Sequence, residues 1–81
     1  MEQLTAPEFN TRIKGYDKEQ IDRMVDRVQR TLNGTAGKDR IRVVELQYFY
    51  FDVRVGGYDR SEVHEFMQQA IGALRQRAVA A

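Results

Sequence analysis

An internal repeat constrains the fold of this chain more than any other feature of its sequence. The tripeptide Gly-Tyr-Asp occurs at residues 15–17 and again at residues 57–59, an offset of 42. At that offset residues 4–32 align with residues 46–74 without a gap and share seven identities in 29 positions, against roughly two expected for unrelated segments. A chain of 81 residues is long enough for one small domain, so we predict a single domain that contains both copies. Its predicted parts are repeat one at 4–33, a linker at 34–38 and repeat two at 41–76.

Each copy has the pattern of a strand, a glycine turn and an amphipathic helix. Alternate residues predict one face of a strand in each copy: Phe9, Thr11 and Ile13 in the first, and Phe49, Phe51, Val53 and Val55 in the second. Gly15 and Gly57 follow, where the chain must reverse and where only glycine takes a positive φ without steric cost. The expected fold class is α+β, with two strand-turn-helix repeats whose amphipathic helices pack on each other and on short strands.

Capping residues predict where the two helices begin. Asp17 and Asp59 can accept hydrogen bonds from first-turn N–H groups, and Gln20 and Glu62, three residues later, would complete capping boxes. The first helix is expected to end at Asn33-Gly34.

Apolar stripes at helical spacing follow both caps. They consist of Ile21, Met24, Val25, Val28 and Leu32 in the first helix, and of Val63, Phe66, Met67, Ala70, Ile71 and Leu74 in the second. Residues 48–51 (Tyr-Phe-Tyr-Phe) favour a core strand with tyrosines at its rim over a base-stacking surface, because the stripes need an apolar surface to cover. Residues 39–47 fit either a short helix or the beginning of the strand.

The first copy resembles the N-terminal domain of the DivIVA/GpsB family. The resemblance lies in Phe9, the Lys-Gly-Tyr-Asp run at 14–17, and the Ile-Asp and Val-Asp pairs at 21–22 and 25–26. The second copy keeps Phe51, Val55, Gly57, Tyr58, Asp59 and Val63, but has Gly56, His64 and Gln68 where the first has Lys14, Asp22 and Asp26.

This resemblance implies a bacterial scaffold or adaptor without catalytic activity that acts in cell division or polar cell-wall growth. Family members dimerise and most continue into a long parallel coiled coil, whereas this chain has no sustained heptads. We therefore expect the two copies to fold against each other as an intramolecular pseudo-dimer. Self-association as a homodimer is a further expectation, since a domain of this size has little surface to bury.

The resemblance also implies a binding site for an Arg-containing segment of a division or cell-wall protein, formed by Tyr16, Asp22 and Asp26. Two like charges four residues apart destabilise a helix by about 0.2 to 0.5 kcal/mol, and a guanidinium partner would relieve that conflict. The alternative is an ordinary solvated face, with Asp26 paired to Arg30 and Asp22 to Lys18.

Ile13 and Lys14 occupy the positions that the resemblance assigns to a membrane-touching tip. One buried isoleucine contributes about 2 kcal/mol and one lysine near anionic lipid about 1 kcal/mol, so a single tip would bind weakly and only an oligomer would hold. The alternative places Ile13 on the inward face of the strand.

Charge and hydrophobicity bear on nucleic-acid binding and on location in the cell. Thirteen Lys and Arg against twelve Asp and Glu leave a net charge of +1, which disfavours nucleic-acid binding. That function, through Arg23, Arg27 and Arg30, is kept as an alternative, as is a purely structural homodimer. The layout of a signal peptide and a run of 18 apolar residues are both missing, so we expect a cytoplasmic protein, at most peripherally bound to the inner face of the membrane.

Catalysis and metal binding are not expected. The chain has no cysteine, and its lone His64 lies near no nucleophile or ligand set in the sequence. Asp22 and Asp26 lack a second carboxylate cluster with which to perform acid–base chemistry. We therefore expect neither catalytic residues nor a cofactor.

Overall fold

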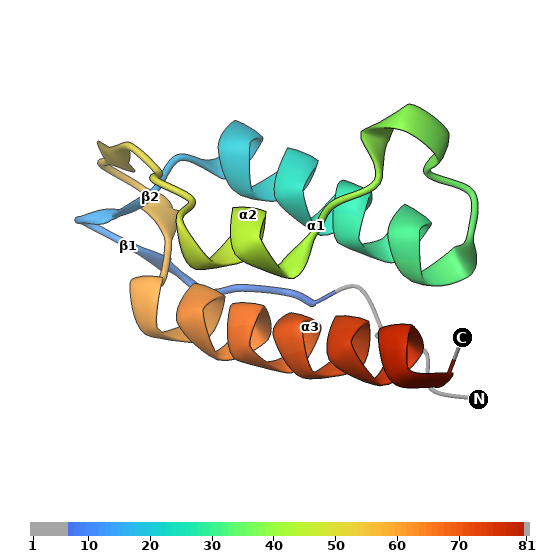
Figure 1. Ribbon diagram of the computed structural model, residues 1–81. Helices are drawn as coiled ribbons and strands as arrows, with labels where there is room; N and C mark the ends of the chain where they lie inside the picture. The colour runs from blue at the N-terminus through green and yellow to red at the C-terminus, as the bar shows by residue number, and fades with distance from the viewer. Residues whose placement is uncertain (1–6, 81) are drawn as a thin grey trace.

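The computed structural model describes residues 7–80 and has an α+β fold, which confirms the predicted class. Its helices are α1 (Lys18–Asn33), α2 (Val43–Gln47) and α3 (Arg60–Ala80), with a 3₁₀ turn, η1, at Gly37–Asp39. Its strands are β1 (Thr11–Arg12), β2 (Gly15–Tyr16), β3 (Val53–Arg54) and β4 (Gly57–Tyr58). The long helices α1 and α3 both begin beside the strands and run toward the opposite end of the molecule, with α2 between them (Figure 1).

Each repeat forms a strand–turn–strand loop, β1 with β2 and β3 with β4, which we call a hairpin although its two strands pair with the other repeat and not with each other. The two hairpins interleave in one antiparallel sheet of order β1-β4-β2-β3. Thr11 pairs with Tyr58, and Tyr16 pairs with Val53. Thr11 and Val53 occupy equivalent positions of the two repeats, and so do Tyr58 and Tyr16. The two pairings are therefore equivalent. Tyr16 also pairs with Tyr58, its own counterpart. The two repeats therefore form an intramolecular pseudo-dimer, in which the strands of each hairpin pair with strands of the other.

The strands are much shorter than the alternation predicted. Phe51 is buried and Phe49 half-buried against the core, but residues 48–52 form no strand, and Tyr48 and Tyr50 are 81% and 83% exposed. The predicted inward face of the strand is also wrong, because Val53 is exposed. The reason is tertiary: pairing begins only where the two hairpins cross, so the alternating pattern does not continue into a ladder.

Gly15 and Gly57 do not have the positive φ that their position before the helix predicted. The described residues with positive φ are Gly34, Gly37 and Gly56. A Cβ atom on Gly15 would instead lie 2.2 Å from the carbonyl carbon of Gly57. Glycine is therefore required here because two backbones approach each other closely at the crossing.

The predicted helix boundaries are confirmed at both ends of α1. Asp17 accepts a hydrogen bond from the Gln20 N–H at 3.1 Å, and Gly34 closes the helix in the left-handed conformation with φ of 77°. The predicted capping box is incomplete, because the Gln20 side chain does not accept the Asp17 N–H. The Asp17 N–H donates to the Asp52 carbonyl at 2.8 Å, which leaves the Gln20 side chain to exchange hydrogen bonds with Asp52 of the other repeat. The start of α3 has the equivalent contacts. Asp59 accepts from the Glu62 N–H and donates its own N–H to the Asn10 carbonyl, while the Glu62 carboxylate accepts from the backbone and side chain of Asn10.

The core lies between α1 and α3 and is closed by the segment that joins the repeats. Both stripes contribute, through Ile21, Met24, Val28, Val63, Phe66, Met67, Ala70, Ile71 and Leu74, all of which are buried. Ile41 and Leu46 complete it, so part of the ambiguous 39–47 segment is the helix α2. The buried Thr31 hydroxyl anchors this segment, since it donates to the Arg27 carbonyl and accepts from the Ile41 N–H. Helix α3 continues beyond residue 76, where repeat two was predicted to end.

Candidate functional site

A tyrosine of one repeat meets an acid of the other at the surface of α1. The Tyr58 hydroxyl donates a hydrogen bond to Asp22 Oδ1 at 2.9 Å, and Lys18 Nζ lies 5.7 Å from the centre of the Tyr58 ring. Partial burial, and then the hydrogen bond to Asp22, raises the pKa of Tyr58. Asp22 itself is exposed, so its carboxylate is open to a partner from outside.

The equivalent pair on the other side joins Tyr16 to His64. The Tyr16 hydroxyl and His64 Nε2 are 2.8 Å apart, and the two rings pack edge to face with centroids 5.6 Å apart. Tyr16 therefore does not join Asp22 and Asp26, as the predicted site required. Because the hairpins interleave, each tyrosine lies against the helix of the other repeat. Tyr58, which the sequence identified only as a structural motif residue, takes the place predicted for Tyr16.

Asp26 is held in an ion pair. Arg30 Nε lies 2.9 Å from its carboxylate, and the Arg30 guanidinium also reaches Asp39 at 3.2 Å. The side-chain hydrogen bonds to Asp26 and Asp39 raise the pKa of Arg30. Asp26 therefore belongs to an ordinary ion-paired helix face, as the alternative predicted. Asp22 instead accepts a hydrogen bond from Tyr58.

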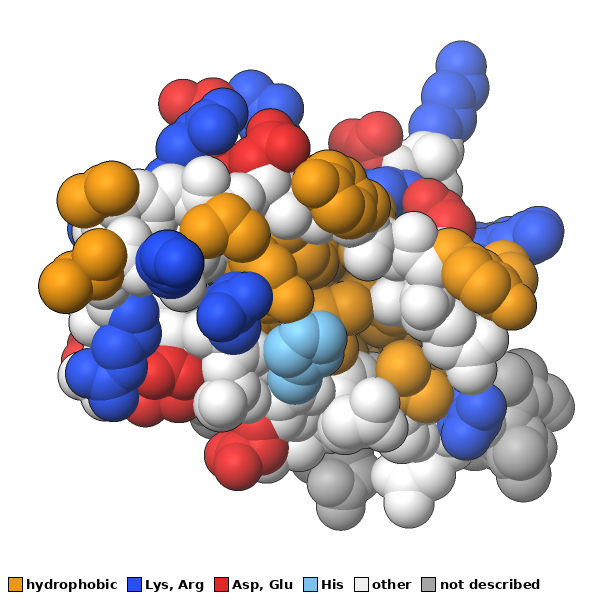
Figure 2. Space-filling model, turned by 90° about the vertical axis from the view of Figure 1, so that its left-hand side faces the viewer, with side chains coloured by type: hydrophobic (Ala, Val, Ile, Leu, Met, Phe, Trp, Pro, Cys, Tyr) orange, Lys and Arg blue, Asp and Glu red, His pale blue; other side chains and the backbone are white. Residues whose placement is uncertain are grey.

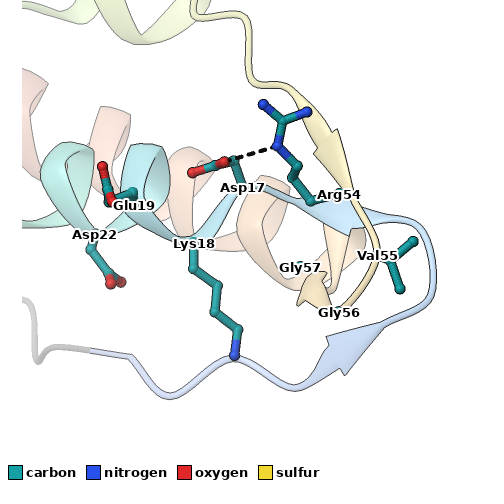
Figure 3. A pocket seen from close by; sticks show the side chains of 8 residues that line it. All are labelled: Asp17, Lys18, Glu19, Asp22, Arg54, Val55, Gly56 and Gly57. Atoms are coloured by element: carbon teal, nitrogen blue, oxygen red, sulfur yellow. Dashed lines mark hydrogen bonds and ion pairs between the residues drawn. The ribbon is translucent and has the colours of Figure 1, made fainter.

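An open polar hollow of about 460 Å³ lies beside Asp22. It is lined by Asp17, Lys18, Glu19 and Asp22 from the start of α1 and by residues 54–57 of the second hairpin. Figure 3 shows the side chains of Lys18 and Asp22 extending on the same side of α1, with the Asp17–Arg54 ion pair near the hairpin. Three carboxylates against two cations make the lining net acidic.

The tips of the two hairpins expose apolar residues at equivalent positions. Ile13 is 78% exposed and Val55 is 89% exposed, so the alternative that placed Ile13 on an inward face is wrong. The Gly56 N–H donates to the Arg12 carbonyl at 3.0 Å, which holds the tips next to each other. Figure 2 looks onto this end of the molecule and shows exposed hydrophobic side chains with Lys and Arg side chains beside them. Lys14, the predicted basic residue of the first tip, is exposed as well.

The arginines of the nucleic-acid alternative are engaged within the chain. Arg27 donates to the Asp39 and Arg40 carbonyls and to Glu45, while Arg30 pairs with acids as described above. Among residues 7–80, Arg23 pairs with Glu19, and both of these side chains are exposed. Two of the three guanidinium groups therefore serve the fold.

Comparison with known proteins does not identify a family for this chain. No family model, curated protein or solved structure matches the chain. Within residues 7–80 no group of three or more His, Asp or Glu side chains is placed to hold a metal ion. No helix in that range has both the length and the apolar character needed to cross a bilayer.

Proposed function

We propose that this protein is a non-catalytic adaptor of the DivIVA type, which works in bacterial cell division or polar cell-wall growth and binds an Arg-bearing segment of a partner beside Asp22. The observation that carries the proposal is the exposed Asp22 carboxylate, oriented by Tyr58 at the edge of a net acidic hollow. We place its action in the cytoplasm, with any membrane contact peripheral and at the inner face.

The chemistry of the pair suits a guanidinium ligand. An ionised carboxylate has about four lone-pair sites, and the Tyr58 hydroxyl uses one of those on Asp22. The rest can accept charge-assisted N–H bonds, which are roughly twice as strong as neutral ones. Asp26, one turn further along α1, is already paired with Arg30, so Asp22 is the principal contact.

Titration calorimetry with peptides that carry a single arginine in varied contexts tests the proposal. We expect Asp22→Asn to weaken the best peptide about 10- to 100-fold, as loss of a charged hydrogen-bond acceptor implies. The matched control is His64→Asn, which alters the equivalent tyrosine pair in the other half and should leave affinity unchanged. Equal binding by the wild type and Asp22→Asn would remove Asp22 from the site.

Membrane contact is a second candidate function, favoured by the 78% and 89% exposure of Ile13 and Val55. Two adjacent tips in one chain provide the bivalency that a single tip lacks. Insertion of both side chains would contribute about 3 kcal/mol or more, and each nearby lysine or arginine about 1 kcal/mol at an anionic surface.

A further inference from the structure

A second hollow lies between α1 and the segment that precedes β3, and it shares no lining residue with the one beside Asp22. Its volume is about 260 Å³. Met24, Phe49 and Phe51 are its apolar lining residues, and the two phenylalanine rings stack with centroids 5.4 Å apart. Tyr50, which also lines the hollow, is 83% exposed. Tyrosine and arginine are, with tryptophan, the residue types enriched at the energetic centres of protein interfaces.

The charged residues that line this hollow, among those that the structure describes, are both cations. They are Arg23 and Arg27, beside the neutral Gln20, while the acids that pair with them, Glu19 and Glu45, lie outside the lining. Hydrogen bonds to the Asp39 carbonyl and to Glu45 hold Arg27 in place. The Arg23 side chain is 76% exposed, and its only described pairing is with the equally exposed Glu19, a kind of contact that stabilises a helix little.

The other repeat shows which of these residues the shared fold requires. At the equivalent positions Phe51 corresponds to Phe9 and Met24 to Phe66, so the apolar character is kept where side chains pack in the core. The surface residues differ. Glu8 stands in the place of Tyr50, and Glu65 in the place of Arg23.

Both Glu8 and Glu65 are exposed, and their half of the molecule forms the equivalent strands and helix. Neither the Tyr50 ring nor the Arg23 charge is therefore needed to build the unit. A large exposed ring and an exposed cation beside an apolar hollow instead suit contact with another molecule.

We propose that this hollow binds an acidic linear segment of another protein, which inserts one bulky apolar side chain against Met24, Phe49 and Phe51 and places an Asp or Glu residue against the exposed Arg23. The hollow is smaller than the roughly 300 to 1,000 Å³ of typical small-molecule sites, which favours one anchoring side chain over a whole ligand. This site differs in place and in charge from the one beside Asp22 and does not depend on it.

A second copy of this chain fits the hollow less well than an acidic peptide does. The most exposed aliphatic residues among 7–77, Ile13 and Val55, sit beside Lys14 and Arg54. Those cations have the same sign as the arginines around the hollow and would be repelled by them. Charge complementarity therefore favours a partner that carries acids next to its apolar anchor.

Selection of a random dodecapeptide display library on the full chain tests the proposal. We expect the selected peptides to share a bulky apolar residue flanked by Asp or Glu. Tyr50→Glu introduces the residue found at the equivalent position of repeat one, so it should fold, and it should weaken the selected peptides about 30-fold. Arg23→Glu should weaken them about 10-fold.

Two controls make the result decisive. Glu65→Arg changes charge at the position equivalent to Arg23 in the other repeat and should leave the affinity unchanged. Binding of Arg-bearing peptides beside Asp22 should survive Tyr50→Glu, which separates a failure here from a failure of the adaptor proposal.

Three results would overturn the inference: a library that yields no binder, selected peptides without acids, or binders insensitive to both Tyr50→Glu and Arg23→Glu. Concentration-dependent sedimentation of the wild type that Tyr50→Glu abolishes would also overturn it, because the occupant would then be a second copy.

Discussion

Gly15 and Gly57 meet backbone to backbone where the two hairpins cross. A Cβ on Gly15 would lie 2.2 Å from the carbonyl carbon of Gly57, and one on Gly57 would lie 2.4 Å from the Tyr16 carbonyl oxygen. Both obstructing atoms belong to the main chain, so no side-chain rotation can relieve the contact. The two halves can interleave only if both positions lack a side chain.

Alanine at either glycine is expected to lower the free energy of unfolding by about 3 kcal/mol, the upper range for overpacking of a well-packed site. Gly72→Ala is the matched control. Gly72 lies in the interior of α3 with open space around a Cβ, so alanine there should stabilise by about 0.5 to 1 kcal/mol. Denaturant unfolding measures all three. A loss below about 1 kcal/mol for Gly15→Ala would contradict the close approach.

Tyr58 gives the protein a response to alkaline pH. Its pKa is raised above the usual 10.0, first by burial and then by the hydrogen bond to Asp22. Because the neutral phenol is favoured in the folded state, its contribution to stability is complete below pH 10.0 and is lost as the pH rises through the folded pKa. Tyrosinate absorbance should show a titration step above pH 10.0 that Tyr58→Phe removes. The step should move toward lower pH in Asp22→Asn, and an unmoved step would contradict the role of that hydrogen bond.

Asp59 gives the opposite response at acid pH. The backbone N–H of Glu62, and then the Arg12 side chain, lowers the pKa of the Asp59 carboxyl from 3.8. Its contribution is therefore present above pH 3.8 and is lost as the pH falls through the folded pKa. Asp59→Asn should be less stable than the wild type at neutral pH, and the difference should shrink in acid. Unfolding measured along a pH series checks this, and a constant difference at every pH would refute it.

The hairpin tips can be tested with lipid vesicles. If both tips insert, Ile13→Glu should weaken binding to anionic vesicles about 30-fold and Val55→Glu about 10-fold, the loss expected for one buried aliphatic side chain each. Val44→Glu is the control, since Val44 is 47% exposed on α2, away from the tips. Co-sedimentation with anionic and with neutral vesicles provides the measurement. Equal binding by all three variants would exclude the tips as the membrane contact.

Much of the fold could be predicted from local patterns. Asp17 and Gly34 mark the ends of α1 because their hydrogen bonds and dihedral preferences act within one turn of the helix. The apolar stripes identified the core because burial on one face imposes helical spacing. The candidate site was predicted only in part. Asp22, which the resemblance named, is exposed beside a hollow, but the tyrosine that bonds it comes from the other repeat.

The sequence by itself determined the duplication, the start of each helix and the α+β class, since these follow from residue order and from interactions between near neighbours in the chain. Only the tertiary structure decided that Tyr58 lies on Asp22 and Tyr16 on His64, that Ile13 and Val55 are exposed, and that Gly15 and Gly57 touch. The physical reason is that all of these depend on how two hairpins about 42 residues apart cross, and such long-range pairing has no local signature.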